Sequence, residues 1–258
     1  ISKHGATNVL IPGKPVLYLT TSGTTGKPKF LPMSREYLSY MTKLQYMSMA
    51  TYSHKIDDIY KGKILAITSK CVEDYAPDNT PVGSTSGATR EKVNGFSTER
   101  LAVPACIFGI TDYAARYYTI MRIAIEQDVR LIITPNPSTV LELMYNCDAH
   151  FDEYCADIEN GTLNKDLKIE SEIRKELEAF VKPNPKRAAE LRAIKAKTEH
   201  PQPKEYWSNM RILATWKCGN TAFYNKKLDK MFPDDTIHVE LGYFASECRF
   251  GITLHRDN

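Results

Sequence analysis

The chain has 258 residues, which is enough for one large domain or two small ones with a substantial core. Its formal net charge of +3 is a mild excess that excludes the clustered basic surface of a nucleic-acid-binding protein. No apolar run approaches the roughly 20 residues of a membrane-spanning helix, and residues 1–5 lack the apolar core of a secretory signal. Six scattered cysteines without metal-ligand spacing indicate reduced thiols. We therefore expect a cytoplasmic protein with neither a nucleic acid nor a membrane as partner.

Short apolar runs and helical periodicity alternate along the first third of the chain. Residues 16–19 and 63–68 are apolar runs of the length expected for buried strands. Between them, Ser34 is a candidate helix N-cap, because apolar residues recur at helical spacing from Tyr37 to Met47. Residues 78–95 are rich in Pro, Gly, Ser and Thr and have no periodicity, which predicts a long loop.

The middle of the chain predicts a helix, a strand and a second helix. The first helix is amphipathic, begins at Thr111 and Asp112, and continues to residue 127. Residues 130–134 form an apolar run that ends at a Pro-Asn-Pro sequence, and Ser138 is the candidate cap of the helix that follows.

Residues 151–206 are rich in charged residues and poor in strand formers, which predicts a charged helical insertion with a solvated face. Within it, residues 168–181 and 186–197 are expected to form two helices separated by a second Pro-Asn-Pro sequence. The remaining segments predict strands at residues 210–216, 236–241 and 249–254 and a helix at residues 222–231.

Strands that alternate with helices and have nearly continuous apolar interiors predict an α/β fold, with a largely parallel or mixed sheet flanked by helices. Open sheets of this kind bind ligands beyond the carboxyl ends of their strands. Two chemically distinctive segments follow predicted strands in this chain, and they are the candidates for such a site.

The first segment, residues 20–29, has the sequence TTSGTTGKPK and directly follows the first apolar run. Glycines let the backbone approach a ligand, hydroxyl and amide groups donate to oxygens, and lysines offset charge, so the segment suits a polyphosphate. It is not a Walker loop, because only Thr24 and Thr25 separate its glycines and Pro28 disfavours a helix start at Lys27. The alternative is an ordinary polar turn.

The second segment, residues 240–248, has the sequence ELGYFASEC. Its aromatic ring can stack on a base, its hydroxyl can contact a phosphate, and a carboxylate can hold Mg²⁺. Taken alone, Tyr243 also fits a core position and Glu247 a solvated surface position.

Together the two segments resemble motifs of the adenylate-forming superfamily, which has a Ser/Thr/Gly-rich loop ending in Lys and a later Tyr-x-x-Ser/Thr-Glu motif. Residues 163–191, with the sequence PNPKRA at 183–188, resemble the auxin-conjugating acyl-acid amido synthetase family and its bacterial relatives. So do the sequences YWSNM at 206–210 and WKCG at 216–219. The resemblance covers essentially the whole chain.

The resemblance implies a role for each matching residue. The β- and γ-phosphates of ATP would be held by Thr21, Ser22, Gly23, Thr24, Thr25, Gly26 and Lys29. Tyr243 would contact adenine, Ser246 the α-phosphate and Glu247 Mg²⁺, and Lys29 and Glu247 would be catalytic. Gly219 and Asn220 would line the adenine and acyl side, where the family more often has small residues and a hydroxyl.

The resemblance also implies the reaction. A carboxylic acid would be activated by ATP as an acyl adenylate and passed to an amino acid as an amide, which makes the protein a ligase. Relatives begin earlier and continue past Glu247, so residues 1–258 are expected to be an incomplete N-terminal ATP-binding domain. An earlier N-terminal part and the mobile C-terminal domain are expected to be missing from these residues, and the chain alone is expected to be nearly inactive. An acyl-CoA ligase with the same adenylation step and a catalytically incomplete nucleotide-binding protein both remain open.

Overall fold

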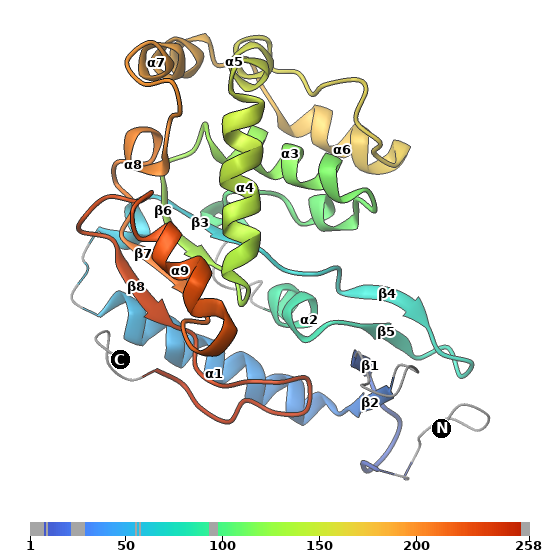
Figure 1. Ribbon diagram of the computed structural model, residues 1–258. Helices are drawn as coiled ribbons and strands as arrows, with labels where there is room; N and C mark the ends of the chain where they lie inside the picture. The colour runs from blue at the N-terminus through green and yellow to red at the C-terminus, as the bar shows by residue number, and fades with distance from the viewer. Residues whose placement is uncertain are drawn as a thin grey trace. The chain divides into compact units, whose positions relative to one another are not determined.

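The computed structural model describes residues 8, 10–21, 29–54, 56, 58–92 and 98–253 of the chain. The described helices and strands divide into two compact units (Figure 1). Unit 1 comprises described residues within Ile1–Tyr52, Thr68–Ser97 and Gly242–His255, and unit 2 comprises those within Ser53–Ile67 and Thr98–Leu241. The α/β class predicted from the sequence is confirmed, but the strands form two sheets rather than one.

Unit 1 contains a mixed four-stranded sheet in the order β2-β1-β5-β4. Its strands are β1 (Leu17–Thr21), β2 (Lys29–Met33), β4 (Val72–Tyr75) and β5 (Pro81–Gly83). β1 pairs antiparallel with β2 and parallel with β5, and β4 pairs antiparallel with β5. The buried side chains of Leu17 and Leu19 in β1 pack with Leu38, which comes from the helix that follows β2.

That helix, α1 (Arg35–Ser53), begins where the sequence predicts. The Ser34 hydroxyl accepts a hydrogen bond from the backbone N–H of Tyr37 at 3.1 Å, which satisfies one of the unpaired donors of the first turn. The predicted N-cap is therefore confirmed.

The predicted loop at residues 78–95 is wrong for its described part, which ends at Lys92, because that part contains β5 and the helix α2 (Thr85–Lys92). The Ser84 hydroxyl caps α2 by accepting from the Gly87 N–H at 3.0 Å. Gly83 allows a close backbone approach, since a Cβ there would lie 1.7 Å from the carbonyl oxygen of Cys71. The Ser and Gly residues that indicate a loop in the sequence thus serve as a cap and a packing contact.

Unit 2 contains a parallel four-stranded sheet in the order β3-β6-β7-β8. The strands are β3 (Lys63–Ala66), β6 (Val129–Ile133), β7 (Ile212–Thr215) and β8 (Ile237–Glu240). All three neighbouring pairs are parallel, and every residue of β7 is buried. This sheet is the parallel α/β sheet that the apolar runs predict.

Helices and short 3-10 turns connect the strands of this sheet along the chain. The α-helices outside the charged segment are α3 (Tyr113–Ala124), α4 (Pro137–Ala149) and α9 (Ala222–Leu228). The 3-10 turns are η1 (Ile59–Lys61), η2 (Thr98–Arg100), η3 (Ala105–Gly109) and η4 (Gly219–Thr221). Asp112 caps α3 by accepting from the Ala115 N–H at 2.8 Å, as predicted.

Ser138 is not the cap of α4, contrary to the prediction. The side-chain oxygen of Asn136 accepts from the Ser138 N–H at 3.2 Å, and Pro137 takes the first helical position. A proline has no N–H to satisfy and its backbone is preorganised for this position, so the cap moves to the residue before it.

The charged segment is helical, as predicted. It contains α5 (Phe151–Asn160), α6 (Ser171–Phe180), α7 (Pro185–Lys195) and α8 (Pro203–Tyr206). α5 and α7 lie side by side (Figure 1), and their inward residues Tyr154, Ile158 and Leu191 join the main core of unit 2. Asn184 is the N-cap of α7, because its side-chain oxygen accepts a hydrogen bond from the Arg187 N–H.

The predicted strand at residues 249–254 is wrong for its described part, which ends at Thr253. Phe244 and Arg249 instead form an isolated antiparallel bridge, because the chain after β8 turns back on itself. In the described part of the chain, no helix is long and apolar enough to span a membrane. The six cysteines all lie in that part, and none of them forms a disulfide there.

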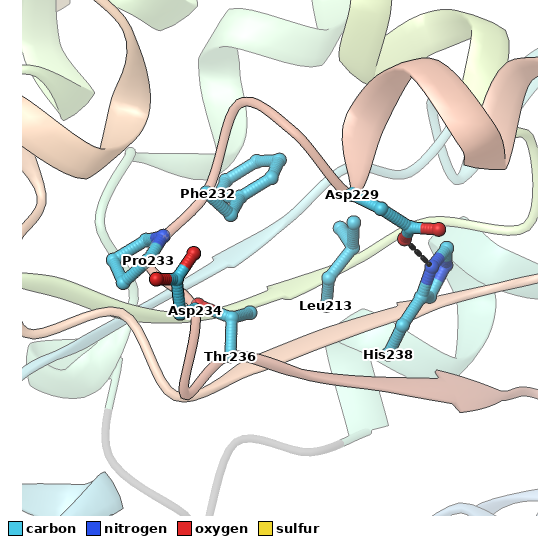
Figure 2. Close-up of a pocket in the computed structure, with 7 residues that line it drawn as sticks. All are labelled: Leu213, Asp229, Phe232, Pro233, Asp234, Thr236 and His238. Atoms are coloured by element: carbon cyan, nitrogen blue, oxygen red, sulfur yellow. Dashed lines mark hydrogen bonds and ion pairs between the residues drawn. The ribbon is translucent and has the colours of Figure 1, made fainter.

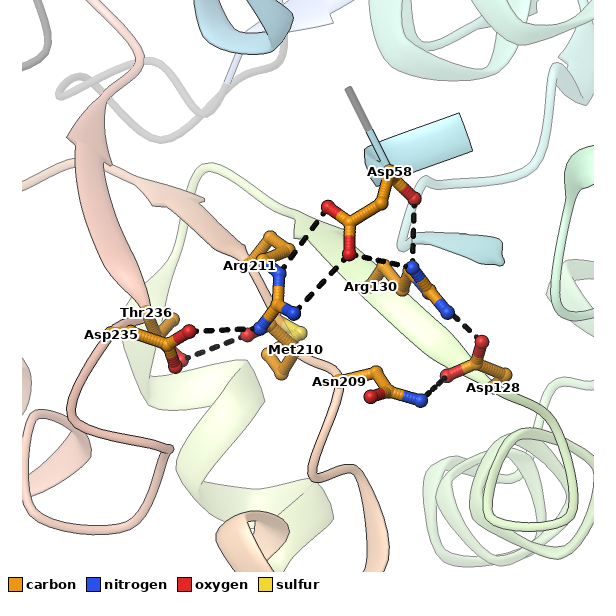
Figure 3. A network of polar contacts seen from close by, with 8 residues as sticks. All are labelled: Asp58, Asp128, Arg130, Asn209, Met210, Arg211, Asp235 and Thr236. Atoms are coloured by element: carbon orange, nitrogen blue, oxygen red, sulfur yellow. Dashed lines mark hydrogen bonds and ion pairs between the residues drawn. The ribbon is translucent and has the colours of Figure 1, made fainter. Parts of the chain in front are cut away.

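A network of charged side chains joins the amino ends of the parallel strands (Figure 3). Asp58, shortly before β3, accepts from Arg130 at 2.9 Å and from Arg211 at 3.2 Å. Arg211 also contacts Asp235, just before β8, at 2.9 Å. The hydrogen bond from Arg211, helped by the charges of both arginines, lowers the pKa of Asp58 below its ordinary value.

We predict that Asp58→Asn lowers the free energy of unfolding by about 2 kcal/mol at pH 7, because two arginines lose their shared carboxylate. Since the folded pKa of Asp58 is lowered, its contribution is present above the ordinary aspartate pKa of about 4 and is lost as the pH falls further. Urea unfolding of wild type and variant at several pH values measures this difference. An equal loss in the exposed control Asp166→Asn, or a difference that persists in acid, would contradict the prediction.

Candidate functional site

The Tyr-x-x-Ser-Glu segment forms a tight turn, which we call the acidic turn (residues 242–251). The carbonyl oxygen of Tyr243 accepts from the N–H groups of Phe250 and Gly251 at 2.9 and 3.1 Å. Nearer the tip, the Ala245 N–H donates to the Cys248 carbonyl at 2.9 Å. These bonds place Ser246 and Glu247 at the tip of the turn.

Gly242 begins the acidic turn in a conformation that suits glycine. Its φ is +83°, and a Cβ at this position would lie 2.6 Å from the carbonyl oxygen of Gly251. Both the left-handed backbone and the close approach exclude a side chain. Gly242 therefore allows the two ends of the acidic turn to approach each other closely.

The acidic turn is bound to α1 at two points within unit 1, and Figure 1 shows the two segments side by side. The Tyr37 hydroxyl donates to the carbonyl oxygen of Ser246 at 3.5 Å. The Arg249 guanidinium donates to the Gln45 side-chain oxygen at 3.2 Å and to the Ser48 hydroxyl at 2.9 Å. Arg249 is only 8% exposed.

The environment of Tyr37 keeps its hydroxyl protonated. Burial raises the pKa of Tyr37 to about 12, and the nearby Cys248 and Glu247 add to the shift because negative charge disfavours a phenolate. The hydroxyl therefore remains a donor to the acidic turn over the whole physiological pH range.

Tyr243 is not a core residue, which excludes the alternative considered from the sequence. Its side chain is 70% exposed and stacks on the ring of Phe250, with the centroids 4.9 Å apart and an interplanar angle of 24°. Phe250 is itself 60% exposed. The two stacked rings expose aromatic surface at the base of the acidic turn, which is chemistry that suits a planar base.

The glycine-threonine segment joins β1 to β2. Thr21 and Lys29 face each other as the last pair of the antiparallel ladder, and Lys29 is exposed. Because Lys29 lies in a strand, the segment does not lead into a helix, as predicted. Ser22, Gly23, Thr24, Thr25 and Gly26 lie outside the described residues. Lys29 is the first residue of β2, and α1 begins shortly after the last residue, Met33. The strand places these two residues about 13 Å apart.

Gly219 and Asn220 belong to unit 2, whereas the acidic turn and Lys29 belong to unit 1. Gly219 and Asn220 lie in η4, shortly after the carboxyl end of β7, and both are exposed. Gly219 has a φ of +65° with open space where a Cβ would lie. They are therefore accessible residues at the edge of the sheet where ligands usually bind.

Three residues of this site are missed by the sequence interpretation. Tyr37 falls in a helical row of apolar residues, which predicts a core position. Arg249 and Phe250 fall in a segment predicted to be a strand. The available signal for Arg249 is a charge inside an apolar segment two residues after the motif, because a buried arginine needs specific partners.

A cavity of about 230 Å³ lies in unit 2 beside the start of β8 (Figure 2). It is lined by Leu213, Asp229, Phe232, Pro233, Asp234, Thr236 and His238. None of the predicted site residues that the structure describes lines it. It lies toward the amino end of β8, away from the carboxyl edge that favours ligands.

His238 in this cavity is held in a defined orientation. Its Nδ1 lies 3.0 Å from the Asp229 carboxylate, and its Nε2 lies 2.8 Å from the Thr215 hydroxyl. Burial lowers the pKa of His238, and the hydrogen bond to Asp229 offsets this only in part. The neutral imidazole thus donates from Nδ1 and accepts at Nε2, which accounts for both contacts.

Comparison with known families identifies the chain. Residues 2–237 match the model of the GH3 family N-terminal domain. The chain belongs to the GH3 family. The matched residues extend into β8, and the acidic turn follows them.

Known GH3 proteins are similar to this chain along most of its length. Jasmonoyl–L-amino acid synthetase GH3.5 of Oryza sativa subsp. japonica is 24% identical over 255 residues, which is 94% of this chain and 43% of that protein. The structure of AtGH3.15 acyl acid amido synthetase in complex with 2,4-DB has a TM-score of 0.79 at 19% identity. A second structure of GH3.15 acyl acid amido synthetase has a TM-score of 0.76 at 20% identity.

The two structural comparisons each cover 93% of this chain, and they establish the GH3 fold. The resemblance to acyl-acid amido synthetases predicted from the sequence is confirmed at the level of the family. This chain spans 43% and 42% of the two solved chains, less than half their length.

We predict that Gly242→Ala loosens the acidic turn, because it combines left-handed backbone strain with a clash against Gly251. A local destabilisation of about 2 kcal/mol corresponds to roughly thirtyfold faster exchange of the amides within residues 242–251. Hydrogen–deuterium exchange mass spectrometry measures this rate. Gly13→Ala is the matched control, since Gly13 has a φ of +73° but open space around it, and it should leave the exchange of residues 242–251 at the wild-type rate. Wild-type exchange of these amides in Gly242→Ala would contradict the prediction.

We predict that His238→Gln makes stability less sensitive to mild acid. Because the folded pKa of His238 is lowered, the unfolded chain takes up a proton first, and the wild type loses stability as the pH falls below about 6.5. The variant lacks this contribution, so its free energy of unfolding should change less between pH 7.5 and 5.5. A wild-type response in His238→Gln would refute the assignment.

Proposed function

We propose that this chain provides the ATP-binding part of an enzyme that activates a carboxylic acid as an acyl adenylate and then transfers the acyl group to an amino acid. Membership of the GH3 family and the names of the similar proteins, which are acyl acid and jasmonoyl amino acid synthetases, support an acid–amino acid ligase. The single observation that carries the proposal is the acidic turn, which presents a hydroxyl, a carboxylate and an aromatic surface together.

The glycine-threonine segment is proposed to bind the β- and γ-phosphates. Thr21 and Lys29, the last pair of the ladder between β1 and β2, flank the segment, and Lys29 supplies an exposed positive charge there. The intervening Ser22, Gly23, Thr24, Thr25 and Gly26 supply amide and hydroxyl donors. Lys29 would stabilise the negative charge that develops on the phosphates during displacement.

The acidic turn is proposed to bind the adenylate portion. Tyr243, backed by Phe250, offers a face for adenine, and Ser246 offers a hydroxyl for the α-phosphate. In unit 2, Gly219 and Asn220 are proposed to line the adenine and acyl side, which their exposure allows.

The residues present fit a Mg²⁺ ion that arrives with ATP. Among the described residues, no group of three or more His, Cys, Asp or Glu side chains has the geometry of a metal cage. Mg²⁺ is commonly bound by one or two carboxylates together with substrate phosphates, and the exposed Glu247 at the tip of the turn is such a carboxylate. When bound, the ion would neutralise phosphate charge.

The chemistry follows from the poor reactivity of a carboxylate as an electrophile. A carboxylate oxygen of the acid attacks the α-phosphorus of ATP, the bond to the β-phosphate oxygen breaks, and pyrophosphate leaves. The amine of the amino acid then attacks the acyl carbon, and AMP leaves. The chain's own residues position the phosphates and offset their charge, and the scheme uses no covalent nucleophile, including Cys218 and Cys248.

The names of the similar proteins favour an amino acid over coenzyme A as the acceptor. Offering the full-length protein an acid and ATP with either amino acids or coenzyme A distinguishes the two ligases. ATP–pyrophosphate exchange by the wild type argues against a nucleotide-binding protein without catalysis. A cytoplasmic location remains part of the proposal.

We predict that Lys29→Ala and Glu247→Ala each reduce acid-dependent ATP–pyrophosphate exchange by about a hundredfold or more, because each removes charge stabilisation at the phosphates. The exchange is measured with radiolabelled pyrophosphate in the full-length protein, and circular dichroism checks folding.

Matched controls are Lys43→Ala on α1 and Glu73→Ala on β4, which are exposed residues of the same types. The controls should retain wild-type exchange. Unchanged exchange in either Lys29→Ala or Glu247→Ala would remove that residue from the proposed site.

A further inference from the structure

We propose that Arg249 is a positioning residue of the nucleotide site, which fixes the acidic turn on α1 and thereby sets the direction in which Ser246 and Glu247 point. The inference rests on the proposed function and adds to it a residue outside the Tyr-x-x-Ser-Glu motif. Its functional consequence is a higher Mg²⁺ requirement when the contact is lost.

The burial of Arg249 is unusual for its place in the chain. Glu247 and Phe250, on either side of it, are exposed, yet Arg249 is 8% exposed. Burying a guanidinium is costly unless its donors are used. Here the guanidinium also lies over the ring of Phe244, 5.4 Å from its centroid, so it packs against its own turn as well as against α1.

The contacts of Arg249 match the fork shape of a guanidinium. Gln45 and Ser48 are three residues apart on α1 and therefore lie on the same face of the helix. Two nitrogens of Arg249 reach these two acceptors separately, at 3.2 and 2.9 Å. A lysine ammonium is a single point of charge and cannot reproduce the planar arrangement.

The second contact of the turn lies farther along the same helix. Tyr37 contacts the tip of the turn and Gln45 contacts its base, and eight residues of helix separate the two by about 12 Å. Two attachment points at this distance prevent the turn from rotating about either one. The bridge between Phe244 and Arg249 transmits the fixed position of Arg249 to both arms of the turn.

The orientation of Glu247 therefore depends on Arg249, although Arg249 itself is not proposed to contact ATP. Partners that orient a metal ligand commonly change metal affinity by 10–100-fold when removed. Loss of the Arg249 contact should thus weaken the use of Mg²⁺ more than it lowers the rate at saturating Mg²⁺.

The test measures ATP–pyrophosphate exchange against Mg²⁺ concentration in the full-length protein, for wild type, Arg249→Gln and Arg249→Lys. In Arg249→Gln the Mg²⁺ concentration for half-maximal exchange should rise about tenfold, while the maximal rate stays close to wild type. Arg249→Lys should give an intermediate shift. Hydrogen exchange of residues 242–251 should accelerate in the same order.

Two further variants separate positioning from general destabilisation. The double variant Gln45→Ala with Ser48→Ala should give the same shift as Arg249→Gln, and combining all three changes should add nothing. This double variant also decides the matter if Arg249→Gln fails to fold. Arg187→Gln is the matched control, because Arg187 is a half-buried arginine bonded to the carbonyls of Ile125 and Tyr206 in unit 2.

An unchanged Mg²⁺ requirement in folded Arg249→Gln, additive effects in the combined variant, or an equal shift in Arg187→Gln would overturn the inference alone. Absence of exchange in the wild type would overturn the proposed function, and the inference would fall with it.

Discussion

A buried guanidinium connects the most chemically distinctive segment of this protein to a helix. Arg249 donates to two side chains on one face of α1, and Tyr37 attaches the tip of the same turn to the same helix. These bonds and the packing on Phe244 offset part of the cost of burying the charge. Ser246 and Glu247 are thereby presented at the tip by a backbone that has a fixed relation to α1. Every role proposed for the acidic turn depends on that relation.

The sequence predicts those parts of the fold in which local signals and tertiary packing agree. The strands of unit 2 are short runs in a parallel sheet, and the central strand β7 is buried on both faces. Ser34 and Asp112 cap the helices that they precede. The failures have local causes. In residues 78–95, serine and glycine act as a cap and a packing contact rather than as loop residues. The division into two sheets depends on long-range strand pairing, which periodicity does not encode.

The candidate site likewise contains residues that the sequence predicts and residues that only the structure reveals. The residue types at Tyr243, Ser246 and Glu247 indicate nucleotide chemistry because aromatic, hydroxyl and carboxylate groups occur together. Their support comes from residues whose sequence context suggests something else. Tyr37 has the spacing of a core residue, and Arg249 interrupts an apolar segment that resembles a strand. Such contacts join residues more than 200 positions apart, so only the folded chain reveals them. The residues of the glycine-threonine segment outside the described part stay a prediction.

The central claim is that one MgATP molecule engages both the glycine-threonine segment and the acidic turn. Hydrogen–deuterium exchange of the wild-type full-length protein, measured with and without MgATP, tests it most directly. We expect the nucleotide to slow exchange both in the peptides that cover residues 20–30 and in those that cover residues 242–251, and magnesium-free ATP to protect residues 242–251 less. Protection of only one of these two regions, or of neither at saturating nucleotide, would show that they do not share one nucleotide.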